Sequence, residues 1–443
     1  MPPDADPDDR ADDAADPPTD PVADAVDADR LRRDIEANAA YGAIDHDDPD
    51  AHGRTVLAGT EANREARAHL VERLEDAGLN VRVDAVGNVA GRWTPDGADP
   101  DAPPVAAGSH LDSVPEGGIF DGPLGVYAAL EAVRAHRDAG LGERLDRPVE
   151  VVSFTEEEGG RFSGGLTGSS VATGVRSVED ALALTDDDGV SLGDALAGIG
   201  FAGEGRLDAG AWGAWLELHV EQDSRLESAG VPVGVVTTIT GITHREATIR
   251  GEANHAGTTG MGERTDALAA AAEVVLDVEA AAREVVATDS DSAVGTVGSC
   301  TVSPNATNVV PGRVDLGVDV RDVERSSMET VLGATDDSLA RVAAERGVDV
   351  DVGTTIDVDP TPMADRVREA VHRAGKATGV ATTDLHSGAA HDTMHVARVT
   401  DAGLLFAPSK DGLSHTPYEW TDWTDCAAAT RVLAAAIAEL AES

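Results

Sequence analysis

Residues 105–126, VAAGSHLDSVPEGGIFDGPLGV, join a short apolar run to a loop rich in glycine and polar side chains. The run at 105–107 predicts a buried strand, and the segment 125–136 beyond the loop has the pattern of a helix. A second apolar strand, 149–154, runs directly into three glutamates. Strands that alternate with helices indicate an α/β fold, with a largely parallel or mixed sheet between helices.

The rest of the chain extends this pattern and interrupts it once. Further helices are predicted at 60–77, 360–375 and 424–442. In between, 234–251 and 314–320 alternate like strands around an alanine-rich helix at 266–286, which is enough for a small α+β domain. We therefore expect a discontinuous main domain with a smaller domain inserted. The predicted order is a disordered acidic tail (1–28), the first segment of the main domain (29–232), the inserted domain (233–348) and the second segment of the main domain (349–443).

The composition excludes several classes of partner. The 443 residues include 82 Asp and Glu against 34 Lys and Arg, and the net charge of −48 argues against nucleic acid or an anionic membrane. No stretch approaches the roughly 20 apolar residues of a transmembrane helix, and no secretory signal is evident, so a cytoplasmic protein is expected. Cys300 and Cys426 are too few for a disulfide framework or a thiolate zinc site.

The charge also indicates adaptation to salt. Lys376 and Lys410 are the only lysines, so nearly every cation is arginine. Self-repulsion of a net charge this large destabilises the compact state unless salt screens it, as it does near 1 M, where the Debye length is about 3 Å. We therefore expect a halophilic protein. The alternative, an ordinary protein with an acidic tail, does not account for acidic residues that persist to the C-terminus.

Polar residues that could carry chemistry follow the first two central strands. His110 ends one strand, Asp112 is placed to orient its ring, and Asp121 is placed to bridge a second ion. Glutamates 156–158 follow the next strand, where they repel one another unless a cation or a shared proton compensates. The alternatives are turn-forming roles for the histidine and aspartates, and an exposed acidic loop for the glutamates.

Other histidines divide into two groups. His69, His136 and His372 sit in helical patterns beside charged residues and are expected on solvated faces. Four more lie in or beside turn-like segments near the ends of apparent strands, where ligands gather in open α/β sheets: His219, His255, His391 and His415. Each alone is more often structural, but with the acidic clusters they form a set suited to two divalent ions and an activated water.

Motifs in a fixed order extend over about residues 30–440: GSHLDSVPEGGIFDGPLGV, EEGGRF, ELHVEQ, HAGTTGM, PNATNVVPG, DVRD, SGAAHD and PSKDGLSHTPYE. With these motifs the chain resembles the hydantoinase/carbamoylase-type amidases of the M20 metallopeptidase superfamily. That group includes N-carbamoyl-L-amino acid hydrolases, allantoate amidohydrolases and β-ureidopropionases. The resemblance implies a catalytic main domain that holds two divalent metal ions (Zn, Mn, Co or Ni), and an inserted lid and dimerisation domain in a homodimer.

Position by position, the resemblance also implies roles for single residues. The implied metal ligands are His110, Asp121 as the bridge, Glu158, His219 and His415. Glu157 takes the position of the general base, and His255 that of a lid histidine that polarises the scissile carbonyl in the partner's site. The implied substrate-binding residues are Asn308 and Arg321, which hold the carboxylate, together with Gln222 and His391. Departures at Gly260, Asp223-Ser224 and Ala390 leave the substrate preference open.

The implied reaction is hydrolysis of the N-carbamoyl (ureido) C–N bond of an N-carbamoyl-L-amino acid to amino acid, carbon dioxide and ammonia. Allantoate hydrolysis is a close alternative, because its ligand set is the same. An aminoacylase or peptidase is disfavoured, since those branches typically have a carboxylate where His219 stands. A non-catalytic module is disfavoured because no ligand is lost and the base is present.

Overall fold

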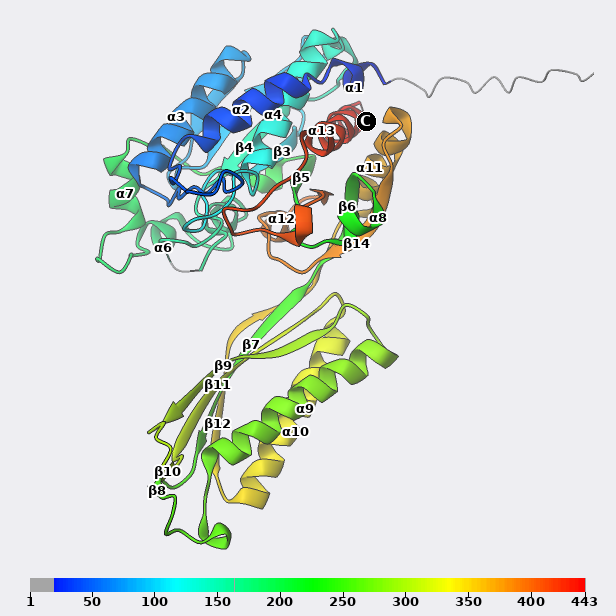
Figure 1. Cartoon of the computed structure of the whole chain (residues 1–443). Helices are drawn as coiled ribbons and strands as arrows, with labels where there is room; N and C mark the ends of the chain where they lie inside the picture. The colour runs from blue at the N-terminus through cyan, green and yellow to red at the C-terminus, as the bar shows by residue number, and fades with distance from the viewer. Residues whose placement is uncertain (1–19, 163, 443) are drawn as a thin grey trace, which may run out of the picture.

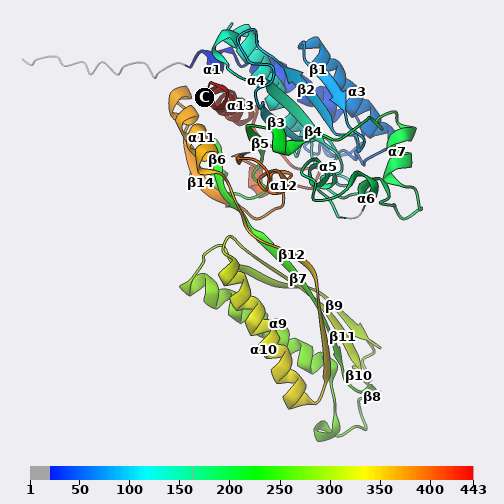
Figure 2. The same ribbon diagram turned by 180° about the vertical axis from the view of Figure 1, so that it is seen from behind.

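A large and a small unit make up the computed structural model, which describes residues 20–162 and 164–442 (Figure 1). The large unit comprises 20–240 and 359–442, and the small unit comprises 241–358. The chain passes between them where β6 leads into β7 and where β12 leads into β13 (Figure 2). Most of the predicted acidic tail, residues 1–19, lies outside the described residues.

The large unit is built on a nine-stranded mixed sheet, so the predicted α/β fold is confirmed. In sheet order its strands are β1 (Asn80–Val83), β2 (Val89–Trp93), β4 (Val149–Phe154), β3 (Val105–His110), β5 (Ala214–Val220), β15 (Ala402–Ala407), β6 (Val233–Ile239) and β13 (Thr361–Pro362), with β14 (Thr382–Ser387) also paired to β6. The central strands β4, β3, β5 and β15 are parallel and wholly buried. Their carboxyl ends therefore meet at one edge of the sheet.

Helices cover both faces of this sheet. On one face lie α2 (Ala28–Ala39), α3 (Glu61–Asp76), α4 (Pro123–Asp138), α11 (Asp365–Thr378) and α13 (Trp423–Ala441). The other face carries α5 (Thr167–Ala172) and α12 (Thr393–Val396), and the shorter peripheral helices are α6 (Val178–Leu182), α7 (Leu192–Gly198) and α8 (Arg225–Ala229). Because side chains alternate along a strand, Val105 and Ala107 pack into the first core and Ala106 into the second. No helix in the described ranges combines the length and apolarity that crossing a membrane requires.

The N-terminal prediction of disorder up to residue 28 is wrong for its last part. Residues 21–25 form α1 (Pro21–Ala25), whose N-cap is Asp20. The Asp20 carboxylate accepts hydrogen bonds from the backbone N–H groups of Val22 and Ala23. Val22, Ala23 and Val26 are buried, and α1 packs against α4 and α13. These few apolar side chains stabilise an acidic segment that composition alone would leave unfolded.

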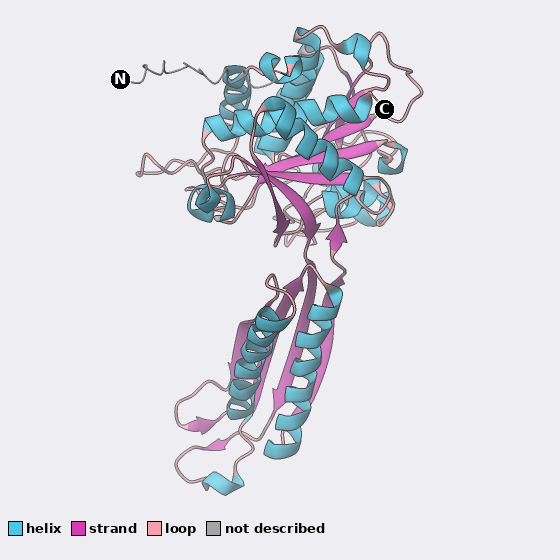
Figure 3. Ribbon diagram, turned by 90° about the vertical axis from the view of Figure 1, so that its right-hand side faces the viewer, coloured by secondary structure: helices cyan, strands magenta, loops and turns pink. Residues whose placement is uncertain are grey.

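The small unit is a four-stranded antiparallel sheet with two long helices on one face (Figure 3). Its strands, in sheet order, are β12 (Asp349–Val358), β7 (Gly241–Arg250), β11 (Arg313–Asp322) and β9 (Val294–Ser303), and its helices are α9 (Ala267–Thr288) and α10 (Arg325–Arg346). A separate two-stranded ribbon, β8 (Asn254–His255) with β10 (Val309–Val310), lies at the end remote from the large unit (Figure 1). Alternate β11 residues from Val314 to Val320 face the helices and form the core.

Two strands beside the predicted domain borders pair in a different sheet from the one that the predicted borders assign them to. The border at 233 assigns β6 to the inserted domain, yet this strand pairs within the nine-stranded sheet. The border at 348 assigns β12 to the main domain, yet this strand pairs with β7 in the small sheet. Sequence alternation predicts a strand from residue 234 but carries no information on its partner, and no strand was predicted at 349–358.

Candidate active site

The predicted metal ligands gather at the carboxyl edge of the central parallel strands. His110 is the last residue of β3, and His219 is the residue before the last of β5. Glu157 and Glu158 follow the end of β4. Asp121 lies in the loop that leads into α4, and His415 lies in the segment that links β15 to α13. This is the edge at which open α/β sheets bind their ligands.

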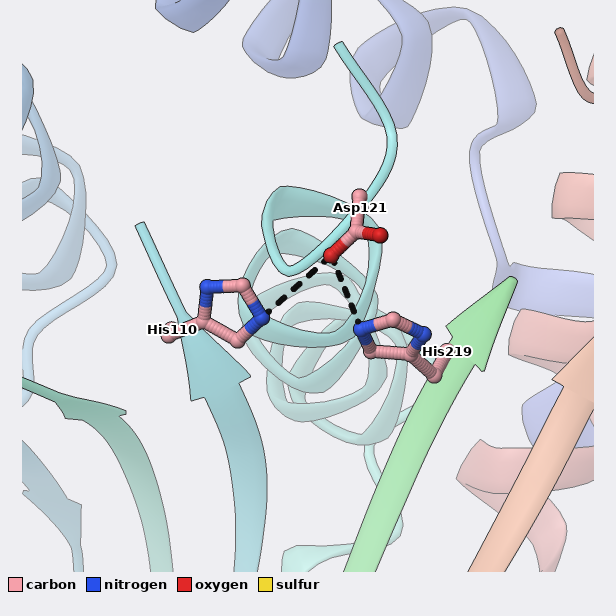
Figure 4. Close-up of side chains that lie close together, drawn as sticks. All are labelled: His110, Asp121 and His219. Carbon is pink, nitrogen blue, oxygen red and sulfur yellow. Dashed lines mark ion pairs between the residues drawn. The ribbon is translucent and has the colours of Figure 1, made fainter. Parts of the chain in front are cut away.

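Asp121 lies between two sets of candidate ligands. Its Oδ1 is 3.5 Å from Nε2 of His110 and 3.2 Å from Nε2 of His219 (Figure 4). Its Oδ2 is 3.6 Å from Nε2 of His415, which is in turn 3.2 Å from Oε2 of Glu158. Within each set the candidate ligand atoms lie within 4.8 Å of one another. A carboxylate with one oxygen facing each set has the arrangement that a bridging ligand requires.

The two buried histidines are oriented so that Nε2 is free to bind a cation. Nδ1 of His110 lies 3.0 Å from the carbonyl oxygen of Asp112, and Nδ1 of His219 lies 3.0 Å from that of Val220. A carbonyl can only accept, so each Nδ1 carries a proton, and Nε2 is the ring atom that faces Asp121 and can bind a cation. Nε2 of His110 is buried without a hydrogen-bond partner among the described residues. This donor set fits a divalent metal ion.

Asp112 acts on this site differently from the prediction. The His110 ring is oriented by the backbone carbonyl of Asp112, whereas the nearest carboxylate oxygen is 4.0 Å from Nδ1. Oδ2 of Asp112 instead accepts a hydrogen bond of 3.1 Å from the backbone N–H of Glu158. Asp112 therefore joins the His110 strand end to the glutamate loop.

The electrostatics of the cluster favour bound cations. Burial disfavours a charged imidazole, yet Glu157 and Asp121 overcome this effect and hold the pKa of His110 well above its usual value. Burial likewise opposes charge on His219, but Asp121 raises its pKa to about 9. Burial and Asp121 raise the pKa of Glu158 to about 8. Carboxylates that lie close together in a buried site repel one another when ionised, and bound divalent cations would offset this repulsion.

Glu157, which the resemblance predicts to be the general base, lies beside the cluster. Its Oε2 is 3.7 Å from Nε2 of His110. Burial raises its pKa well above the usual value, and Glu158 adds to this effect while His110 opposes it. Its backbone carbonyl accepts a hydrogen bond of 2.7 Å from the N–H of Leu166, which fixes the loop. Glu157 and Glu158 also form a third candidate ligand set with His110.

Gln222, Ser414 and Glu419 hold Asp121 in place. Nε2 of Gln222 and Oγ of Ser414 donate to Oδ2 of Asp121, at 2.8 and 2.7 Å. Oε1 of the buried Glu419 accepts from the backbone N–H groups of Phe120 and Asp121, and its Oε2 accepts from Ser414. Ser414 and Glu419 received no role from the sequence, although both lie in the motif that contains His415.

A cavity of about 690 Å³ opens over this cluster between the two units. Arg321 of β11 lines it, and its Nη1 donates a 2.9 Å hydrogen bond to the carbonyl oxygen of Gly388 in the large unit. His391 also lines it, with its ring centroid 4.6 Å from that of His219. Burial and His219 hold the pKa of His391 well below its usual value. Three of the four predicted substrate-binding residues, Gln222, Arg321 and His391, thus line the cavity over the candidate metal ligands.

His255 and Asn308 lie elsewhere. His255 is in β8 and Asn308 precedes β10, and the carbonyl oxygen of Asn308 accepts a 2.9 Å hydrogen bond from the N–H of Ala256. Both side chains are exposed at the far end of the small unit. The structure therefore brings these two residues together, but neither is among the residues that line the cavity of their own chain.

Comparison with known proteins agrees with this geometry. Residues 106–439 match the model of Peptidase family M20/M25/M40. The chain is 38% identical over 411 residues to an N-carbamoyl-L-amino-acid amidohydrolase of Paenarthrobacter aurescens, covering 92% of this chain and 96% of that protein. It is 34% identical over 393 residues to the allantoate amidohydrolase of Bacillus subtilis, with coverages of 87% and 91%.

Solved structures extend the match to the whole fold. An amidase of the hydantoinase/carbamoylase family from Burkholderia multivorans superposes with a TM-score of 0.87 at 35% identity, covering 94% of this chain and 98% of that one. The family match, the relatives and the site geometry agree. The chain therefore belongs to peptidase family M20/M25/M40, as a hydrolase of the hydantoinase/carbamoylase type.

Proposed function

We propose that the protein is a binuclear metal-dependent amidohydrolase that cleaves the N-carbamoyl C–N bond of N-carbamoyl-L-amino acids. The observation that carries the proposal is Asp121, whose two carboxylate oxygens face two different ligand sets at one sheet edge. The similarity to an N-carbamoyl-L-amino-acid amidohydrolase over nearly the full length of both proteins supports the choice of substrate.

Two divalent cations are the proposed cofactors. His110, Asp121 and His219 would hold one, and Asp121, Glu158 and His415 the other. Imidazole and carboxylate ligands without a thiolate suit zinc, manganese, cobalt or nickel. Such ions, when bound, lower the pKa of water and polarise a carbonyl group.

Residues of the chain then handle the protons and the substrate. Glu157 accepts a proton from the attacking water and returns it to the ureido nitrogen that leaves as ammonia. The remaining N-carboxy amino acid loses carbon dioxide to give the free amino acid. Asp319 orients the guanidinium of Arg321 by accepting from its Nε and Nη2. The N–H groups of Nη1 and Nη2 that remain would bind the substrate carboxylate, a task for which a guanidinium is well shaped.

Asn308 and His255 require a second chain in this proposal. Both are exposed at the far end of the small unit and do not line the cavity of their own chain. We propose a homodimer in which each small unit delivers them to the partner's cavity. There His255 would stabilise the developing oxyanion, and Asn308 would contact the carboxylate.

The test measures ammonia and free amino acid. The protein, loaded with manganese or zinc in molar KCl, is incubated with N-carbamoyl-L-amino acids, allantoate, an N-acetyl amino acid and a dipeptide. Ammonia from carbamoyl substrates is expected. Glu157→Gln should lower turnover by roughly 100-fold or more while the protein keeps its metal, because the proton acceptor is lost. The exposed Glu179→Gln serves as a control.

Other outcomes would reject the proposal. Amino acid released without ammonia, from the acetyl or peptide substrate alone, would indicate an aminoacylase or peptidase. Substantial activity in Glu157→Gln would remove the base assignment. We also propose adaptation to molar salt, in keeping with the net charge of −48, so the same assay in 0.1 M KCl is expected to give lower activity.

A further inference from the structure

One wall of the cavity over the metal cluster is apolar, and the proposed mechanism makes no use of it. Aliphatic side chains lining it are Leu166 from the large unit, and Ile242 and Ile356 from the small unit. Among the described lining residues, Arg321 is the only lysine or arginine. Its Nε and Nη2 donate to the carboxylate of Asp319, so a substrate carboxylate would bind to the remaining N–H groups of this guanidinium.

Ile242 and Arg321 are neighbours on the same face of the small sheet. They are directly opposite each other in the pairing of β7 with β11, so their side chains project to the same side. That side faces away from α9 and α10, because Ile249, seven residues along β7, packs on the helix side. A carboxylate held by Arg321 thus has Ile242 beside it.

A β-bulge brings Ile356 to the same face. The pairing of β12 with β7 shifts register between Thr354 and Ile356. Before the shift, Val350 is opposite Ile249 and packs on the helix side. One extra residue reverses the alternation, so Ile356 is opposite His244 on the cavity side. Ile356 remains 40% exposed, as a side chain facing an open cavity does.

Leu166 completes the wall at the cost of backbone strain. Its φ of 47° lies in the left-handed region, which a bulky side chain rarely adopts. Its N–H hydrogen-bonds the carbonyl oxygen of Glu157, so the strained residue lies next to the proposed base. Strain of this kind persists where the surroundings enforce it, and it clusters at ligand sites.

We infer that the cavity selects N-carbamoyl-L-amino acids with an aliphatic side chain, a selectivity that rests on the proposed ureido hydrolysis. With the carboxylate at Arg321, the substituent on the α-carbon meets Ile242 and Ile356. The second ureido group of allantoate, or the second carboxylate of N-carbamoyl-aspartate, would lose water there without gaining a partner. An aliphatic side chain instead buries apolar surface.

The test compares kcat/KM of the metal-loaded enzyme for N-carbamoyl-L-leucine, N-carbamoylglycine, N-carbamoyl-L-aspartate and allantoate. The kcat/KM for N-carbamoyl-L-leucine is expected to exceed that for each of the other three substrates by about tenfold or more. The leucine-to-glycine ratio below is the kcat/KM for N-carbamoyl-L-leucine divided by that for N-carbamoylglycine. Ile242→Thr and Ile356→Thr should each lower the leucine-to-glycine ratio severalfold. Val352→Thr, on the same strand as Ile356 but outside the cavity, should leave the ratio unchanged.

Three results would overturn the inference. A leucine-to-glycine ratio near one, or faster turnover of allantoate, would reject aliphatic selectivity and leave ureido hydrolysis intact. An unchanged ratio in both isoleucine variants, folded as judged by thermal unfolding, would show that the wall does not contact the substrate. No ammonia from any of the four substrates would reject the selectivity together with the proposed function.

Discussion

Glu419 fixes the position of Asp121 although it does not line the cavity. Its Oε1 accepts hydrogen bonds from the backbone N–H groups of Phe120 and Asp121, and its Oε2 accepts one from the hydroxyl of Ser414. Glu419→Ala should weaken metal binding by roughly 10- to 100-fold, as loss of a group that orients a ligand commonly does. Competition with a chelator measures the affinity. Glu419→Gln keeps one carbonyl oxygen for the two N–H groups and should be milder.

A purely structural role for Glu419 predicts a different pattern. Both variants would then lose thermal stability in the metal-free protein, in proportion to their loss of metal affinity. Equal metal affinity of Glu419→Ala and the unsubstituted protein would contradict the positioning role.

At the scale of single residues, the sequence located the candidate ligands at one edge of the sheet but not the contacts that hold them. Polar residues at the ends of buried strands indicated His110 and the glutamates 156–158, because parallel strands end at a common edge, and the family resemblance then singled out Glu158. The sequence could not show that Asp112 orients His110 through its carbonyl, or that Glu419 supports Asp121. These contacts join residues far apart in the chain and depend on backbone geometry.

At the scale of elements, His136 ties α4 to α13. The prediction of a solvated face is wrong: His136 is fully buried, and its Nε2 donates a 3.1 Å hydrogen bond to the carbonyl oxygen of Ala434. Charged neighbours on α4 suggested an exposed helix face, but α13 covers this position. Burial lowers the pKa of His136 to about 4.

This burial makes the packing of α4 against α13 sensitive to acid. The unfolded chain protonates His136 near pH 6.5 and the folded chain only near pH 4, so stability present above pH 6.5 is lost as the pH falls toward 4. The loss from this group is about 3 kcal/mol. His136→Gln keeps a donor but cannot be protonated, so its free energy of unfolding should fall less between pH 7 and pH 4.

Urea unfolding at several pH values, with metal present throughout, measures this difference. His46→Gln, a substitution in an exposed loop, controls for the loss of a histidine outside the core. Parallel pH profiles for His136→Gln and the unsubstituted protein would contradict the prediction.

The small sheet shows why element borders escaped the sequence. β12 was not predicted as a strand, and its partner is β7, about 100 residues earlier in the chain. The bulge before Ile356 leaves no periodic signal, yet it decides which side chains reach the cavity. Local patterns thus indicate some of the elements, whereas pairing and register depend on the assembled sheet.

At the scale of the whole molecule, the separation of His255 from the candidate metal ligands gives the proposed dimer a direct test. In a symmetric dimer with exchanged small units, each active site takes Glu157 from one chain and His255 from the other. His255→Ala and Glu157→Gln chains are each expected to be nearly inactive alone. A mixed dimer contains one site with both groups intact.

Mixing the two variants under conditions that exchange subunits should therefore restore activity. Random exchange makes half of the dimers mixed, with one complete site of two, so about a quarter of the unsubstituted activity is expected. Ammonia release after mixing measures the recovery, and native mass spectrometry verifies the mixed dimers. Mixing Glu157→Gln with His415→Ala should restore nothing, because both substitutions damage the site of their own chain. Mixed dimers without recovered activity would place His255 outside the partner's reaction and leave each large unit to act alone.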